Sequence, residues 1–258
     1  MGFETFLGNS KAVTDVRAML AGSRVPGALL FSGPDGVGKK TLALMLAKAL
    51  NCERRAPGGD DFCGECRRCQ KAEEMLTATR EDLARRRTVK DATKRVEGLV
   101  YFDLQLIEPI TRFILIEQVR QLRSVVYTHP FEFPRRVFVI DQAQTIHWQA
   151  IDLLLKVLEE PPESTVLILI TSNSYELRPT IRSRCRKVQF LSVEEAIIGK
   201  FLAGREGLNK SQQDLGVRVA AGSIAKARAI SSREATPEAL SSAPWQTLSP
   251  STGGQIPK

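Results

Sequence analysis

The feature that most constrains the fold of this chain is a glycine-rich loop between two apolar segments. The stretch "GPDGVGKK" follows the apolar run "ALLFS" and precedes the apolar, helix-forming run "LALMLAKALNC". The order strand, G-x-x-x-x-G-K loop, helix is the context that a phosphate-binding loop requires. Gly33, Gly36 and Gly38 let the backbone curl so that its N–H groups face a phosphate, and Lys39 is placed to reach the outer phosphates. We therefore predict a nucleotide site built on these residues.

The position after Lys39 departs from this pattern. A serine or threonine hydroxyl normally ligates magnesium there, but this chain has Lys40. An ammonium group has no lone pair to offer and repels a metal ion. Thr41 lies one helical step further on, roughly 100° around the helix axis, so we do not expect it to substitute. Metal-assisted binding of ATP is therefore expected to be impaired.

A second departure follows another apolar run, "VFVIDQAQ". Asp141 ends this run as the magnesium-binding aspartate does in P-loop proteins. The next residue is Gln142, where an ATPase of this pattern would carry glutamate. A glutamine side chain can hydrogen-bond a water molecule but cannot accept its proton. We predict weak or absent hydrolysis, the alternative being that a different residue supplies the base.

The remaining pattern alternates strands with helices. Further apolar strands are expected in "RRVFVIDQA" and "TVLILITSN", and "PTIRSRCRKVQF" reads as a basic helix that leads into a strand. Helical patterns occupy residues 10–22, 112–128 and the stretch "QAIDLLLKVLEE", which Pro161 and Pro162 end. This alternation predicts an α/β fold, a parallel sheet with helices on both faces.

The cysteines predict a metal module. Cys52, Cys63, Cys66 and Cys69 have the spacing C-x10-C-x2-C-x2-C. Four thiolates complete the tetrahedral coordination of zinc and leave no open position for catalysis, so we expect structural zinc. Disulfides, which are rare in a reducing cytosol, and an iron–sulfur cluster are the alternatives. The fifth cysteine, Cys185, is isolated and is expected to pack in the core.

The chain is expected to divide into several parts. Residues 1–190 form the P-loop domain, with the zinc module at 52–69. Residues 70–97 are charged and have no apolar stripe, so they are expected to form an exposed helical insertion. The composition changes near residue 191, and 193–231 read as three short helices. Residues 232–258 are rich in Ser, Pro, Thr and Gly and are expected to be a disordered tail.

Net charge and hydropathy limit the kinds of partner that we expect for this chain. The net charge is +8. Such an excess of positive charge favours binding to a polyanion such as nucleic acid, the alternative being that it only keeps the protein soluble. No apolar run is long enough to span a bilayer, and no secretory signal is evident, so we expect a cytoplasmic protein without membrane contact. The basic helix and the start of the following strand carry five cations, Arg178, Arg182, Arg184, Arg186 and Lys187. They form a solvated face or a nucleic-acid-binding patch, or one of the arginines is an arginine finger.

Together these motifs resemble bacterial clamp-loader subunits, the AAA+ proteins of the DNA polymerase III holoenzyme, and among them most closely the delta-prime subunits. The resemblance spans roughly residues 3–231 and is carried by "CGECRRC", "LLLKVLEEPPE" and the sequence Ser183-Arg184-Cys185 in addition to the two nucleotide motifs.

The resemblance implies a RecA-like AAA+ P-loop domain followed by a small helical lid domain, in residues 191–231. It implies that Arg184 is a finger that completes the ATP site of an adjacent ATPase subunit, and that Ser172 or Asn173 is at the sensor position. The implied partners are gamma/tau and delta subunits, with which the chain would form a hetero-oligomer. This complex would bind the sliding clamp and primed DNA. It would be part of a DNA-directed DNA polymerase holoenzyme.

The departures distinguish the subunits of this family. ATPase subunits have GKT or GKS, an Asp-Glu pair and a lid arginine, where this chain has Lys40, Gln142 and Ala225. Retention of Arg184 favours the non-hydrolysing, delta-prime-like type. The alternatives are a hydrolysing gamma/tau-like subunit and a nucleic-acid-binding module outside replication. We expect no counterpart of the family's C-terminal collar domain in these residues, the alternatives being a truncated chain and a version of the subunit without the collar.

Overall fold

The computed structural model describes residues 2–22, 24–56, 58–91, 94–205 and 208–232. They divide into two compact units, one that ends at Val193 and one that begins at Glu194. The predicted tail at 232–258 lies, apart from residue 232, outside the described residues.

The first unit is built on a five-stranded parallel sheet. Its strands are β1 (Ala28–Ser32), β2 (Leu104–Ile107), β3 (Arg136–Ile140), β4 (Thr165–Thr171) and β5 (Arg186–Gln189). Their order is β2-β3-β4-β1-β5, and each neighbouring pair is parallel. All residues of β1, β2, β3 and β4 are buried, as expected of strands that helices cover on both faces.

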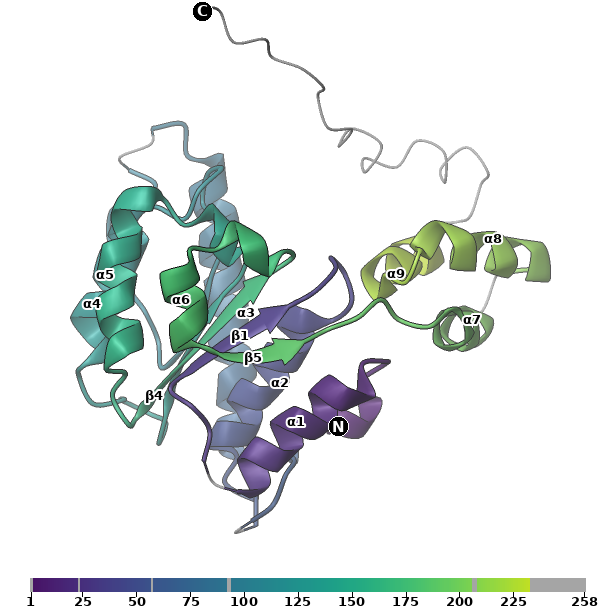
Figure 1. Cartoon of the computed structure of the whole chain (residues 1–258), viewed down its shortest axis with the longest axis horizontal. Coiled ribbons are helices and arrows are strands. Elements are labelled where there is room, and N and C mark those ends of the chain that lie inside the picture. The colour runs from purple at the N-terminus through teal and green to yellow at the C-terminus, as the bar shows by residue number, and fades with distance from the viewer. Residues whose placement is uncertain (1, 23, 57, 92–93, 206–207, 233–258) are drawn as a thin grey trace, which may run out of the picture. The chain divides into compact units, whose positions relative to one another are not determined.

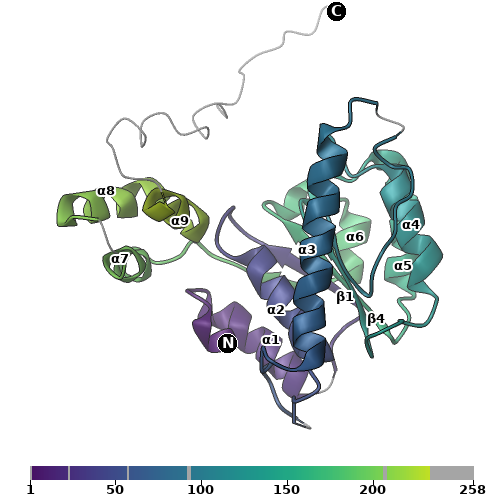
Figure 2. The ribbon, with the colours of Figure 1, turned by 180° about the vertical axis from the view of Figure 1, so that it is seen from behind.

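Helices cover both faces of the sheet (Figure 1). One face carries α1 (Ser10–Ala21), α2 (Lys39–Asn51) and α3 (Arg67–Thr88), which Figure 2 shows in front of the sheet. The other carries α4 (Ile116–Val126), α5 (Trp148–Glu159) and α6 (Pro179–Arg184). Short 3-10 turns lie at Phe3–Thr5, Ala143–Thr145 and Ser174–Glu176. The predicted α/β fold with a parallel sheet is confirmed.

Strand β2 is the element that sequence reasoning missed. It has four residues, and its pattern "LQLI" is too short to separate from a loop. The helix predicted at 112–128 is also shorter, because Ile114 forms a parallel bridge with Ile146 before α4 begins.

The segment predicted as an exposed helical insertion at 70–97 is helical as far as Thr88, but the prediction that the helix is exposed is wrong. The helix α3 spans Arg67–Thr88 and buries one side against α2 and β2. Ala72, Met75, Leu76 and Leu83 lie on that side at helical spacing and are at most 6% exposed. The stripe was overlooked because charged residues separate its members, and its last position is a buried arginine, Arg86.

The second unit contains three helices within its described residues, α7 (Glu195–Ala203), α8 (Lys210–Ala220) and α9 (Ile224–Ser232), as predicted for 193–231. Ile198, Leu202, Ala220, Ala227 and Ile230 form its buried side. Its assignment as a lid domain stays a prediction. No helix among the described residues is long and apolar enough to cross a membrane.

Candidate nucleotide site and metal centre

The glycine-rich loop lies at the carboxyl end of β1, the edge where open parallel sheets bind ligands. Gly33, Gly36 and Gly38 have φ of 148°, 75° and 101°, which side chains disfavour. A Cβ on Gly33 would lie 2.2 Å from the carbonyl oxygen of Phe190, so this position also requires glycine for space. Within the described residues, the backbone N–H groups of Gly36, Val37 and Gly38 have no hydrogen-bond partner. They remain available to an anion.

Lys39, the first residue of α2, is folded back onto this loop. Its Nζ donates to the carbonyl oxygens of Gly33 at 2.5 Å and Pro34 at 2.6 Å, and lies 3.7 Å from Asp35 Oδ1. Burial lowers the pKa of Lys39, against the opposing effect of Asp35 and Asp141. A bound phosphate would have to replace these carbonyl contacts.

Asp141 and Glu108 lie side by side at the ends of neighbouring strands. Asp141 follows β3 and Glu108 follows β2, and the last residues of these strands, Ile140 and Ile107, are paired in register. The Asp141 backbone N–H donates to the Ile107 carbonyl at 2.9 Å, which extends the pairing by one residue. Two carboxylates therefore lie near the start of the helix that carries Lys39 and Lys40.

Lys40 contacts both of these carboxylates. Its Nζ lies 2.7 Å from Glu108 Oε1 and 2.9 Å from Asp141 Oδ2. Burial lowers the pKa of Lys40, but the attraction of Asp141 and Glu108 outweighs this effect, and the pKa is raised overall. The side chain therefore stays charged at neutral pH.

Arg87, in the last turn of α3, completes this group of charges. Its Nη2 lies 2.8 Å from Glu108 Oε2 and 3.1 Å from the Pro109 carbonyl oxygen. Burial raises the pKa of Glu108, but Lys40 and Arg87 outweigh this effect and hold it below its ordinary value. We call Arg87, Glu108, Lys40 and Asp141 the Lys40 cluster.

Magnesium does not fit the arrangement at Asp141. The ion requires oxygen ligands at about 2.0–2.1 Å, and the P-loop normally contributes a hydroxyl at the position of Lys40. Here the ammonium group already contacts the carboxylate that would hold the ion. Thr41 is exposed on the outside of α2.

Gln142 lies at the surface directly after Asp141. It has a left-handed backbone with φ of 53° and is exposed, and its N–H donates to Asp141 Oδ1 at 3.0 Å. Asn173 is also exposed, and its side chain accepts from the Tyr175 N–H at 3.0 Å and donates to Glu176 Oε1 at 3.3 Å. The structure thus joins Lys40 and Asp141 directly, whereas nucleotide roles for Gln142 and Asn173 stay predictions.

Arg184 is the last residue of α6 and lies at the surface. Its Nη2 lies 2.7 Å from Glu159 Oε1, and its Nη1 donates to the Thr180 carbonyl at 3.0 Å. The Arg184 side chain is 35% exposed. The neighbouring Arg182 differs, because its guanidinium stacks on the Tyr175 ring, 5.3 Å from the ring centroid.

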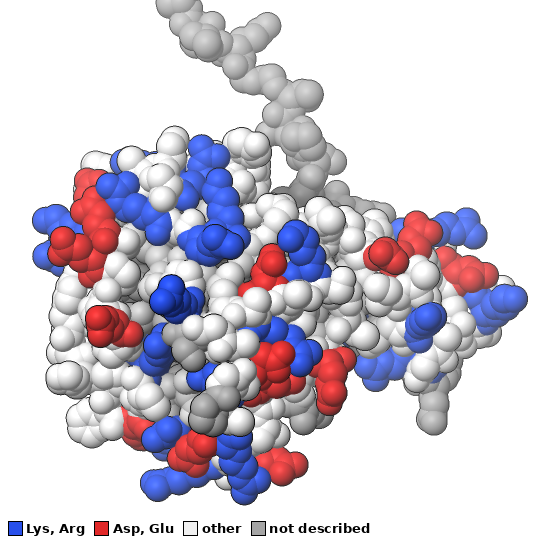
Figure 3. All heavy atoms as spheres, turned by 60° about the horizontal axis from the view of Figure 1, so that its bottom comes forward, with Lys and Arg blue, Asp and Glu red and all other residues white. Residues whose placement is uncertain are grey.

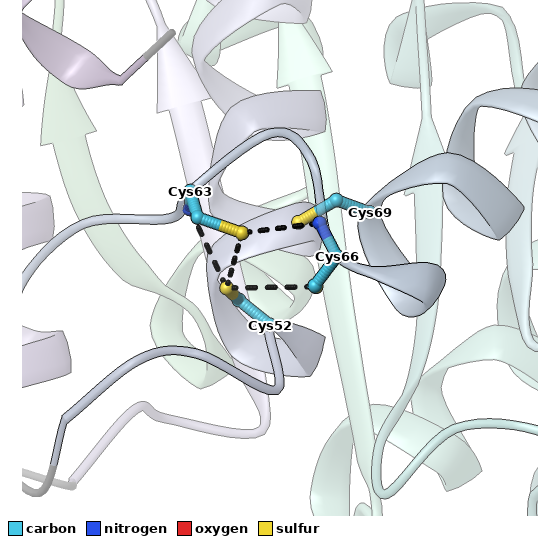
Figure 4. A group of neighbouring side chains, drawn as sticks. All are labelled: Cys52, Cys63, Cys66 and Cys69. Carbon is cyan, nitrogen blue, oxygen red and sulfur yellow. Dashed lines mark hydrogen bonds between the residues drawn. The ribbon is translucent and has the colours of Figure 1, made fainter.

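The four predicted metal ligands converge. The Sγ atoms of Cys52, Cys63, Cys66 and Cys69 all lie within 4.8 Å of one another (Figure 4). The Cys52 sulfur lies 3.6 Å from Cys63 Sγ and 3.9 Å from Cys66 Sγ. Four sulfurs at about 2.3 Å from one ion would have similar separations, so the group fits a metal such as zinc.

Backbone N–H groups donate to the sulfur of one of these cysteines, Cys63. The N–H groups of Glu65 and Cys66 donate to Cys63 Sγ at 3.5 and 3.3 Å. Burial raises the pKa of Cys63, but these donors and the Cys52 thiol together outweigh burial and lower the pKa overall. Cys185 is separate from the group and buried in the core, which raises its pKa to about 12. Its predicted packing role is consistent with this position.

Two residues of the Lys40 cluster, Glu108 and Arg87, were not predicted from the sequence. Glu108 is an acidic residue directly after an apolar strand, the same signal that identified Asp141, but its strand was missed. Arg87 belongs to the helix that was expected to be exposed. On the face shown in Figure 3, Lys and Arg lie among Asp and Glu.

The sheet and the residues at its edge define the fold class of the protein. A parallel sheet with a phosphate-binding loop after β1 and an aspartate after β3 is a P-loop nucleotide-binding fold of the AAA+ type. The RuvB Holliday junction branch migration motor of Thermotoga maritima is similar, with a TM-score of 0.53 and 14% identity over 88% of this chain and 62% of that one. A gamma subunit-related protein of DNA polymerase III from the same organism has a TM-score of 0.51 and 17% identity, over 80% of this chain and 53% of that one. At these identities the likeness shows the fold alone.

The chain belongs to the family described as DNA polymerase III, delta subunit, which matches residues 8–194. It is 35% identical over 158 residues to the delta-prime subunit of Pseudomonas aeruginosa, which covers 61% of this chain and 41% of that protein. It is 29% identical over 199 residues to the tau subunit of Bacillus subtilis (77% and 31%), and 28% identical over 200 residues to the gamma subunit of Buchnera aphidicola (78% and 48%). The chain spans less than half the length of these relatives. Its predicted membership among DNA polymerase III clamp-loader subunits is confirmed.

Proposed function

We propose that this chain is a delta-prime-like clamp-loader subunit that does not hydrolyse ATP and supplies Arg184 to the ATP site of a neighbouring subunit. Its partners are gamma/tau and delta subunits in a cytoplasmic complex that loads the sliding clamp onto primed DNA. Residues 1–190 serve as the P-loop domain and 191–231 as the lid.

The contact between Lys40 and Asp141 carries this proposal. At 2.9 Å the ammonium group pairs with the aspartate that an ATPase uses for magnesium, and Gln142 cannot act as a base. Both changes affect the chain's own site. Arg184, in contrast, is partly exposed at the end of α6, where its guanidinium contacts Glu159 and, within its own helix, Thr180 and Ser183. A guanidinium at the surface can reach a phosphate bound by a neighbour, as arginine fingers do.

The test is single-turnover ATP hydrolysis in a reconstituted complex in which only the adjacent ATPase subunit retains its P-loop lysine. We expect Arg184→Ala to slow hydrolysis by roughly tenfold or more, since fingers in related enzymes contribute larger factors. Arg178→Ala is the matched control, because Arg178 is also exposed and lies directly before α6. Unchanged hydrolysis in an intact Arg184→Ala complex would rule out the finger.

A gamma/tau-like ATPase is the second candidate. The similarity to gamma and tau subunits over 77–78% of the chain favours it. This function predicts magnesium-dependent hydrolysis by the isolated chain that Lys39→Ala abolishes. We expect no such activity.

The cysteine group gives the subunit a structural zinc site. It joins the end of α2 to the start of α3, since Cys52 follows α2 and Cys66 precedes α3. Closed coordination by four thiolates suits a structural role rather than a catalytic one.

A further inference from the structure

The Lys40 ammonium group lies where the two strand ends bring their carboxylates together. It contacts Glu108 at 2.7 Å and Asp141 at 2.9 Å, and these side chains are only 13% and 14% exposed. Because the carboxylates come from paired strands, their separation is fixed by the sheet. A single cation between them is therefore part of the folded structure rather than a contact between two mobile surface chains.

The charges of the Lys40 cluster balance without an added ion. Lys40 and Arg87 contribute two positive charges, and Glu108 and Asp141 contribute two negative charges. A divalent ion would have to displace Lys40 and would leave the cluster with excess positive charge. Binding of magnesium is opposed both by the space that the ammonium fills and by its charge.

The ammonium still has capacity for a phosphate. A lysine donates three hydrogens, and in the described part of the chain Lys40 donates a hydrogen bond to Glu108 and forms an ion pair with Asp141. Lys40 directly follows Lys39, the phosphate-binding lysine, at the N-terminal end of α2. The side chain is 44% exposed, so its third hydrogen can face an incoming ligand.

We propose that Lys40 is a tethered cation that replaces magnesium: the loop of Gly33, Gly36 and Gly38 binds the phosphates of a nucleoside triphosphate, and Lys39 and Lys40 neutralise them without a metal ion. This proposal rests on the geometry of the chain's own loop and not on the role of Arg184.

Two residues position this cation. Glu108 accepts from Lys40 on one oxygen and from Arg87 on the other, so Arg87 fixes the carboxylate that holds the lysine. Arg87 lies at the end of α3, which thereby connects the helix after the cysteine group to the nucleotide loop. Glu108→Gln would weaken the hold on Lys40 and leave Asp141 as its remaining anionic contact.

The test is equilibrium binding of ATP to the full chain, in EDTA and in excess magnesium. For the wild type we expect the same affinity in both buffers, within about twofold. Lys40→Thr restores the hydroxyl that P-loops use, so its ATP affinity should become at least about tenfold stronger with magnesium. Lys48→Thr is the matched control, because it removes a lysine from the same helix that pairs with Glu73 instead. It should bind ATP as the wild type does.

Two results would overturn the proposal. One is that magnesium strengthens ATP binding by the wild type about tenfold, and the other is that the wild type binds no ATP in either buffer. If Lys40→Thr does not fold, electron paramagnetic resonance of manganese, added with ATP to the wild-type chain, decides whether a metal ion binds with the nucleotide. A protein-bound manganese signal contradicts the tethered cation, and ATP binding without that signal supports it. Either failure leaves the Arg184 proposal standing, since that role is measured in the neighbouring subunit.

Discussion

Arg184 and Glu159 form an ion pair of 2.7 Å at the surface, between the ends of α6 and α5. The two side chains are 35% and 49% exposed, and pairs of this kind contribute less than about 1 kcal/mol to stability. We therefore predict that Arg184→Ala lowers the free energy of unfolding by less than about 1 kcal/mol, measured by urea denaturation.

Glu159→Gln is the control for this first prediction, because it removes the same pair from the other side. Both variants should unfold at nearly the wild-type urea concentration. A loss above about 2 kcal/mol for Arg184→Ala alone would show that this arginine has a structural role, and its effect on hydrolysis would then not identify a finger.

Asp103 and Arg136 form the opposite kind of pair. Their side chains are 2% and 6% exposed, with Arg136 Nη2 at 3.1 Å from Asp103 Oδ1. Asp103 Oδ2 also accepts from the backbone N–H groups of Phe131, Glu132 and Phe133. We predict that Asp103→Ala destabilises the protein by roughly 3–5 kcal/mol, because it leaves a buried arginine without its counter-ion and three backbone N–H groups without their acceptor.

Thermal and urea unfolding measure this second prediction. Asp152→Ala, at an exposed position of α5, is the matched control and should change stability by no more than about 0.5 kcal/mol. Equal effects of the two substitutions would mean that the buried pair contributes nothing beyond a surface carboxylate.

The fold was predictable where burial leaves a continuous apolar run. Strands β1, β3 and β4 are such runs, and their sequences identified both the sheet and the loop that follows β1. Strand β2 was not predictable, because four residues that include Gln105 do not differ from a loop in composition. The buried side of α3 was missed because Thr79 and Arg86 lie on it. Arg86 is buried through hydrogen bonds to the carbonyl groups of Arg95, Glu97 and Gly98, which the sequence does not show.

The site was predictable to the extent that local motifs define it. The loop, Asp141 and the four cysteines are identified by spacing within short segments. The contact of Lys40 with Asp141 joins residues about a hundred positions apart and depends on the order of strands in the sheet. The sequence indicated that Lys40 would repel a metal ion, but only the paired ends of β2 and β3 show that Glu108 shares it.

The cysteine group gives a third prediction. If the group holds zinc as proposed, Cys66→Ser should abolish zinc binding and lower the melting temperature, since one of the four thiolate ligands would be lost. Metal analysis by mass spectrometry and thermal unfolding with and without a chelator measure this. Cys185→Ser is the control, because Cys185 is buried apart from the group and should leave the zinc content unchanged. A wild-type protein that contains no zinc and is insensitive to chelation would contradict the prediction.

The fourth prediction concerns pH and the Lys40 cluster. The pKa of Glu108 in the folded protein lies below its ordinary value of 4.5, because Lys40 and Arg87 together outweigh the effect of burial. A carboxyl whose pKa is lowered by folding releases its proton more readily in the folded state, so it stabilises the protein above its ordinary pKa. That contribution is lost as the pH falls through the lowered value in the folded state. The free energy of unfolding is measured in urea from pH 7 down to about pH 3. It should fall less steeply with falling pH for Glu108→Gln than for the wild type.

The comparison with a second carboxylate makes this pH prediction specific. Glu163→Gln removes a carboxyl after the end of α5, away from the cluster, and should leave the acid dependence of the wild type in place. The stability difference between wild type and Glu108→Gln should be largest at neutral pH and should shrink as Glu108 becomes protonated, because a protonated glutamic acid no longer attracts Lys40 and Arg87. A difference that stays constant from neutral to acid pH would show that Glu108 acts through packing alone, and the pairing of Lys40 with Glu108 would then contribute no electrostatic stability.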